Sequence, residues 1–142
     1  MHGRMWEYKK LAKYAHMQPE DVAVWERFIA KNPEYFDSVE YDVEIGEGAP
    51  QNPEHADNIQ ADGKILSQKK IDVVGYKDDL VFVVEVKPVA NMRCLGQCIA
   101  YCALFKATYT PSSEVKCMVV CREVERELGE VFREHDILIE TA

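Results

Sequence analysis

The stretch from residue 69 to residue 88 reads KKIDVVGYKDDLVFVVEVKP, and it decides the fold. Two runs rich in β-branched residues flank a short polar segment, which is the pattern of a β-hairpin. If Asp78 and Asp79 form a two-residue turn, counting outward from the turn places Asp72 directly across from Glu85. The hairpin therefore predicts two carboxylates at one point of a sheet.

Carboxylates placed opposite each other repel, so the pair needs a partner of positive charge. A divalent cation such as Mg²⁺ would supply it, since Mg²⁺ binds carboxylate oxygens and keeps water ligands. Lys87 lies two residues beyond Glu85 and shares its face of the strand. Pro88 has no amide hydrogen, so we expect it to end the pairing. The alternative is a surface hairpin with a solvated acidic pair.

Residues 91–109 carry the apolar periodicity of a helix, for which Asn91 is a suitable N-cap. Arg93, Gln97 and Tyr101 recur every four residues as a polar stripe. This stripe could point back toward the two carboxylates, or it could be the ordinary border between a buried and a wet face. The expected apolar face consists of Leu95, Cys98, Ile99, Cys102 and Phe105.

These motifs together resemble the PD-(D/E)XK nuclease superfamily, which includes many restriction endonucleases and RecB-type exonucleases. The resemblance rests on Asp72, on the Glu-Val-Lys triplet at 85–87, and on residues 97–101, which look like the Gln-x-x-x-Tyr motif of the RecB-type branch. Ile71 stands where the superfamily's name-giving proline would be. The order and spacing of the motifs carry more weight than any single one.

The resemblance implies a Mg²⁺-dependent deoxyribonuclease, with Mn²⁺ as a substitute metal. Asp72, Glu85 and the backbone carbonyl of Val86 would bind the metal. Lys87 would orient or activate the attacking water, and Gln97 would help to hold the site, with Tyr101 and Arg93 in support. Neither endonuclease nor exonuclease action is favoured by the sequence.

The flanking segments predict an α/β fold in which a mixed sheet is flanked by helices. The order is that of the restriction-endonuclease-like αβββαβ core with a C-terminal αβ addition, within a single domain of residues 1–142. Glu26, on the first helix, is a further candidate metal ligand, although a solvated glutamate is the more ordinary interpretation. The remaining elements are expected as helices over 19–31 and 123–134 and as strands over 38–46, 115–121 and 137–140.

Residues 47–68 are rich in Gly, Pro, Asn and Asp, which predicts a long loop that could contact DNA. The five cysteines include no Cys-x-x-Cys pair. Buried small side chains are therefore favoured over a zinc or iron–sulphur site.

The chain has a net charge of −8, which disfavours nucleic-acid binding because that binding depends largely on neutralising phosphate groups. Two segments are nevertheless basic: residues 1–18 have four basic residues and one acidic residue, and residues 63–111 have seven and four. Trp6 and Tyr8 lie in the first segment and could stack on bases or anchor the terminus. The candidate DNA-binding residues are Lys9, Lys10, Lys13, Lys69 and Lys70.

The composition contains no apolar run of membrane-spanning length and no signal-peptide pattern, which favours a cytoplasmic protein that binds no membrane. DNA is the expected partner, with a second protein or a second copy of the chain as further candidates. Two other function classes stay open. One is a catalytically inert nuclease-fold module that binds DNA or protein, and the other is an acidic accessory protein.

Overall fold

The structure is a computed structural model that describes residues 3–142, so the first two residues of the basic segment 1–18 lie outside the described residues. Within that range one mixed sheet has six strands in the order β1-β2-β3-β4-β5-β6. The strands are β1 (Trp6–Glu7), β2 (Ser38–Ile45), β3 (Lys69–Lys77), β4 (Leu80–Ala90), β5 (Glu114–Val124) and β6 (Ile137–Thr141). Strands β1 to β4 pair with one another in antiparallel fashion. Strands β4, β5 and β6 pair in parallel.

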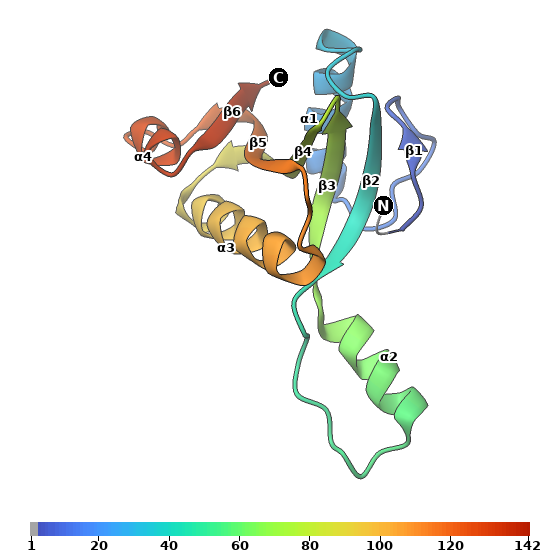
Figure 1. Ribbon diagram of the computed structural model, residues 1–142. Helices are drawn as coiled ribbons and strands as arrows, with labels where there is room; N and C mark the ends of the chain where they lie inside the picture. Colours follow the sequence, from blue (N-terminus) through green and yellow to red (C-terminus); the bar gives the residue numbers. More distant parts are fainter. Residues whose placement is uncertain (1–2) are drawn as a thin grey trace.

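The helices are α1 (Pro19–Lys31), α2 (Asp57–Ser67), α3 (Met92–Tyr109) and α4 (Gly129–Glu134). The chain order α1-β2-β3-β4-α3-β5, followed by α4 and β6, confirms the predicted αβββαβ core with its C-terminal addition. Helices α1 and α3 cover opposite faces of the sheet (Figure 1). Alternate residues of β5 follow this division, because Met118 and Val120 pack in the cluster of α1 while Cys117 and Val119 pack in that of α3.

The register of the hairpin is the predicted one. Val73 pairs with Val84, and the ladder continues to Lys77 opposite Leu80, which leaves Asp78 and Asp79 as the turn. Asp78 has a φ of 52°, a left-handed conformation that aspartate tolerates in tight turns.

The expectation that Pro88 ends the pairing of its strand is wrong. On the side of β5, strand β4 continues in parallel through Ala90 paired with Val124. Lys87 and Val89 have partners there, whereas Pro88 has none. A proline is tolerated at such a position because no ladder hydrogen bond is required of it.

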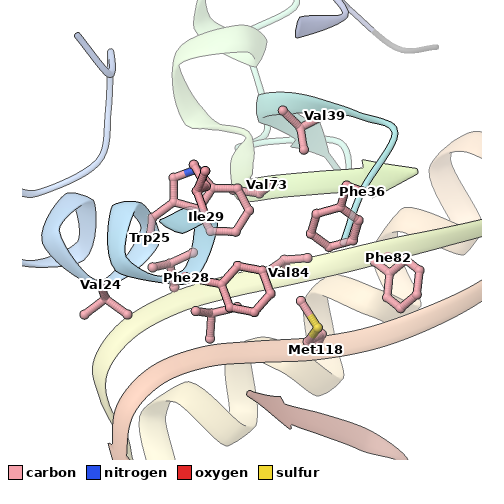
Figure 2. Packing of buried hydrophobic residues seen from close by; sticks show 12 residues of the cluster. Val24, Trp25, Phe28, Ile29, Phe36, Val39, Val73, Phe82, Val84 and Met118 are labelled. Carbon is pink, nitrogen blue, oxygen red and sulfur yellow. The ribbon is translucent and has the colours of Figure 1, made fainter. Parts of the chain in front are cut away.

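The core on the α1 side is aromatic. Trp25 and Phe28 of α1, both fully buried, stack on each other with ring centroids 5.6 Å apart and pack with Phe36 toward the sheet (Figure 2). Gly75 of β3 leaves the room that Phe36 needs, because a Cβ at that position would come within 2.5 Å of the ring. This packing fixes α1 against β4 and β5, and with it the first turn of α1, where Asp21 approaches Lys87.

Residues 47–68, expected to be a loop throughout, contain helix α2. This helix and the preceding connection project away from one end of the sheet (Figure 1). The expected helix over 123–134 is also too long, because β5 extends through Val124 and α4 begins only at Gly129. On α3 the buried side includes Cys94, whereas Ile99, expected to be buried, is 41% exposed.

Tyr8 is an anchor of the N-terminal segment. Its ring packs against Trp25 and Phe36, and its hydroxyl donates a hydrogen bond to the Asn32 carbonyl at 2.7 Å. Trp6 pairs with Val39 at the edge of the sheet and is only half-buried. Tyr8 is half-buried as well, so neither of the two aromatic residues considered for base stacking is fully exposed. No helix in residues 3–142 is long and apolar enough to cross a membrane.

Candidate active site

The two strands of the hairpin separate at Asp72. The β3–β4 ladder ends at the pair Val73 and Val84, and the next free amide of β4, that of Val86, donates a hydrogen bond to Asp72 Oδ2 at 3.0 Å. A carboxylate thus replaces the backbone carbonyl that would otherwise accept this bond. In a strand the N–H and C=O of one residue point to the same side. The Val86 carbonyl therefore lies on the side where the strands have parted.

Asp72 and Glu85 are in side-chain hydrogen-bond contact across this opening. Burial, followed by the negative charge of Asp72, raises the pKa of Glu85 well above its ordinary value. Burial also raises the pKa of Asp72, although the Val86 amide and Lys87 oppose that rise. Burial and mutual repulsion therefore favour a proton on this pair, since two carboxylates in contact resist ionising together.

Glu85 is 2% exposed, and its Oε1 atom is buried with no hydrogen-bond partner. An unpaired buried acceptor destabilises a fold by about 1–3 kcal/mol, and more when it is charged. Glu85 therefore has a buried acceptor without a hydrogen-bond partner, which is a common property of sites that bind a ligand.

Lys87 lies in the same place, with Nζ 3.8 Å from Asp21 Oδ2. Burial acts to lower the pKa of Lys87, but the attraction of Asp72, Asp21 and Glu85 outweighs it and the pKa lies above its ordinary value. The side chain is therefore an ammonium at neutral pH. It can donate hydrogen bonds and offset negative charge, but it cannot take up a proton.

Helix α3 closes the other side of the site. Its N-cap is Asn91, as predicted, whose side chain accepts a hydrogen bond from the Cys94 amide at 2.9 Å. Gln97 is in hydrogen-bond contact with Tyr101, and Tyr101 lies close enough to Glu85 and Asp72 for their charges to raise its pKa after the larger effect of burial. A cleft of about 440 Å³ opens here; its lining includes Glu20, Lys87, Asn91, Arg93, Cys94 and Gln97.

The structure thus brings together Asp72, Glu85, Lys87 and the polar stripe of α3. Glu26 is not among them, because its Oε2 atom lies 3.5 Å from the Tyr14 hydroxyl instead. The acid that α1 directs toward Lys87 is Asp21, which is buried. Five residues along a helix turn a side chain to another face, which is why Glu26 does not share the position of Asp21.

Asp42 is a second acid that the sequence analysis did not single out. The pairs Tyr41–Val73 and Val43–Ile71 flank it, so Asp42 lies across from Asp72 on the neighbouring strand. Burial raises the pKa of Asp42, His16 opposes the rise, and the charge of Asp72 adds to it. Its position in the register of β2 against β3 is the signal that could have identified it.

The donor set fits a hard divalent cation. The observation is the orphaned Glu85 Oε1 beside Asp72, where two adjacent carboxyls have a single ammonium, that of Lys87, which Asp21 shares. Within residues 3–142 no three or more His, Cys, Asp or Glu side chains are grouped as a complete metal site. Carboxylate and carbonyl oxygens are hard donors of the kind that suit Mg²⁺ or Mn²⁺, and Mg²⁺ needs only one or two protein carboxylates because it keeps several waters.

The five cysteines are free thiols, all buried. Cys94, Cys98 and Cys102 follow one stripe of α3, and Cys117 of β5 faces them, with its Sγ atom 3.3 Å from the Cys98 carbonyl oxygen. They fill the space between α3 and the sheet as small core residues.

The lysines proposed to contact DNA are on the surface at two places. Lys10 and Lys13 are exposed near the N-terminus, and Lys9 there is ion-paired with Glu7 at 2.9 Å. Lys69 and Lys70 begin β3, three and two residues before Asp72. The pKa of Asp42 is raised by burial, and the nearby charge of Lys70 acts in the opposite direction without cancelling that rise.

No protein-family model and no curated protein sequence matches the chain. Among solved structures, it is similar to the crystal structure of a repair endonuclease from Pyrococcus abyssi, with a TM-score of 0.48 and 15% sequence identity. The similarity covers 92% of this chain and 49% of that protein, so this chain spans about half of its length.

Proposed function

We propose that the protein is a divalent-metal-dependent nuclease of the PD-(D/E)XK superfamily that hydrolyses phosphodiester bonds in DNA. The observation that carries the proposal is the pair of half-buried Asp72 and buried Glu85, with one orphaned oxygen, at the point where β3 and β4 part. The proximity of Lys87 and of the α3 stripe, in the order that the sequence motifs follow, supports the same function. The RecB-type branch is the closest match, because Gln97 and Tyr101 are in contact as one unit.

Asp72, Glu85 and the Val86 carbonyl would hold Mg²⁺ or Mn²⁺. When bound, the metal supplies Lewis-acid polarisation of the phosphate and lowers the pKa of a bound water. The shared proton of the Asp72–Glu85 pair must leave before both carboxylates can act as ligands. Binding should therefore strengthen as the pH rises.

Lys87 acts as a hydrogen-bond donor. Its ammonium can orient the attacking water and stabilise the negative charge that grows on the phosphate oxygens in the transition state. Asp21 lies 3.8 Å from this ammonium and, after Asp72, contributes to the rise in the pKa of Lys87. Gln97 and Arg93 line the cleft beside Lys87, where they can hold the phosphate backbone of the substrate.

The test is a cleavage assay on supercoiled plasmid, linear duplex and single-stranded DNA, with Mg²⁺, Mn²⁺ or EDTA. We expect cleavage with either metal, none with EDTA, and none for Asp72→Asn with either metal. The three substrates also distinguish endonuclease from exonuclease action. A folded protein that leaves all three substrates intact with both metals would refute the proposal and favour an inert binding module.

A further inference from the structure

A second cavity of about 280 Å³ lies between the N-terminal segment of the chain and strand β2, beside the candidate active site. Its walls are largely aromatic and aliphatic. The lining includes Trp6, Leu11, Lys13, Tyr14, Tyr41 and Asp42.

The aromatic walls present ring surface rather than hydroxyl groups. The Tyr41 hydroxyl accepts a hydrogen bond from Trp25 Nε1 at 2.9 Å, and the Tyr14 hydroxyl accepts one from the Leu11 amide at 3.1 Å. The two tyrosine rings meet edge to face at 5.5 Å, and Trp6 meets Tyr41 in the same manner at 6.5 Å. Because both hydroxyls are engaged within the protein, the rings are left as apolar walls.

Asp42 supplies the polar group of this cavity. It is half-buried and has a φ of 54°, a left-handed conformation that is rare within a strand. Unusual backbone conformations of this kind gather at functional sites. Asp42 also lies across from Asp72 in the register of β2 and β3, so the cavity borders the candidate metal site at the distance of neighbouring strands.

The rim of the cavity is basic. Lys13 lines it and is exposed, and the Arg4 guanidinium lies over the Trp6 ring at 3.9 Å from the ring centroid. Residues 1–18 as a whole carry four basic residues and one acidic residue. An apolar cavity with one acceptor at its wall and cations at its rim matches a nucleotide, which has a flat base and an anionic phosphate.

We propose that this cavity binds one unpaired base of the nucleic-acid substrate, next to the phosphodiester bond that is cut. The substrate class is then single-stranded DNA or a duplex with a frayed or unpaired end, since a paired base cannot enter a cavity of this kind without leaving the stack. Asp42 accepts hydrogen bonds, so a base with an exocyclic amino group, such as cytosine, is preferred to thymine. This inference rests on the proposed function for the role of the neighbouring site, but base binding itself can be measured without cleavage.

The test fills the cavity from its exposed side. Ala15 lines it and is exposed, so Ala15→Phe blocks the space without removing a core contact. Ala30→Phe is the matched control, because Ala30 is exposed on α1 and does not line the cavity. Fluorescence anisotropy with labelled oligo-dC, oligo-dT and blunt duplex, in EDTA, measures binding without cleavage.

We expect Ala15→Phe to weaken binding of oligo-dC at least about fivefold relative to the wild type, as loss of one stacked base would, while the control binds normally. Binding of the blunt duplex should not differ between the two variants. Asn is tolerated at positive φ and both donates and accepts, so Asp42→Asn should retain the fold and reduce the preference for oligo-dC over oligo-dT. Melting temperatures of all variants show that they are folded.

Three results would overturn the base-binding proposal. These are equal binding of oligo-dC by Ala15→Phe and the wild type, equal loss in Ala30→Phe, or no binding of any oligonucleotide by the wild type. If the wild type cleaves DNA with Mg²⁺ and Ala15→Phe has no effect on binding, the cavity proposal alone fails. If Ala15→Phe abolishes binding but the wild type never cleaves, the nuclease proposal alone fails.

Discussion

Glu85→Gln should stabilise the metal-free protein. Glu85 is 2% exposed, its Oε1 atom has no hydrogen-bond partner, and Asp72 faces it. Glutamine has nearly the same size, removes the titrating charge, and can donate an amide hydrogen to the Asp72 carboxylate. The gain should be about 2 kcal/mol near pH 8, because an unpaired buried acceptor costs about 1–3 kcal/mol and more when it is charged, and glutamine carries no charge. For a chain of this length that corresponds to a rise in melting temperature of roughly 6 °C.

The pH dependence of this gain follows from the raised pKa of Glu85. Burial and Asp72 lift that pKa well above its ordinary value of 4.5, so above pH 4.5 the folded state holds a proton that the unfolded state has released. The free energy of unfolding of the wild type therefore falls as the pH rises from 4.5 toward the raised pKa of the folded state. This contribution is fully present below pH 4.5. Glutamine does not titrate, so the free energy of unfolding of Glu85→Gln does not fall in this way. The difference in stability between the variant and the wild type should therefore grow as the pH rises.

Urea denaturation in EDTA at pH 5 and pH 8 measures both effects on the wild type and the variant. Glu123→Gln is the control, because Glu123 is exposed on β5. The reasoning is refuted if Glu85→Gln is no more stable than the wild type at pH 8, or if its advantage is the same at both pH values.

Three further predictions concern the site and its support. Lys87→Ala should reduce cleavage by at least about 100-fold, as loss of a transition-state donor does, while urea denaturation still shows cooperative unfolding; unchanged cleavage would assign the lysine no role. Asp21→Asn removes a charge that raises the pKa of Lys87, so the alkaline limb of the pH profile of cleavage should move to lower pH; a lower rate with an unmoved limb would mean that Asp21 is merely structural. Gly75→Ala should destabilise the fold by about 1–3 kcal/mol, because its Cβ would meet the Phe36 ring at 2.5 Å; equal urea midpoints would contradict this packing.

The sequence was most informative where local pattern and tertiary structure agree. The β-branched runs on either side of Asp78 and Asp79 predict both strands and their register, since a two-residue turn fixes which residues face each other. That register alone places Asp72 near Glu85. The N-cap Asn91 marked the start of α3 correctly for a similar reason, because capping is a local interaction.

The errors arose where the outcome depends on distant contacts. Helix α2 lies in a segment rich in Gly, Pro, Asn and Asp, which favours loops, and it projects from the sheet rather than packing on it (Figure 1). The choice between Asp21 and Glu26 depends on how α1 is rotated on the sheet, and the packing of Trp25 and Phe28 sets that rotation. Asp42 lies in a different strand from the motif residues, and only the pairing of β2 with β3 brings it beside Asp72.

The central claim, that Asp72 and Glu85 form a divalent-metal site, is tested most directly by electron paramagnetic resonance of Mn²⁺ titrated into the protein. The account predicts saturable Mn²⁺ binding by the wild type that is stronger at pH 8 than at pH 6, is displaced by excess Mg²⁺, and is lost in Glu85→Gln. Mn²⁺ binding of equal strength in the wild type and Glu85→Gln, or none in the folded wild type, would contradict it.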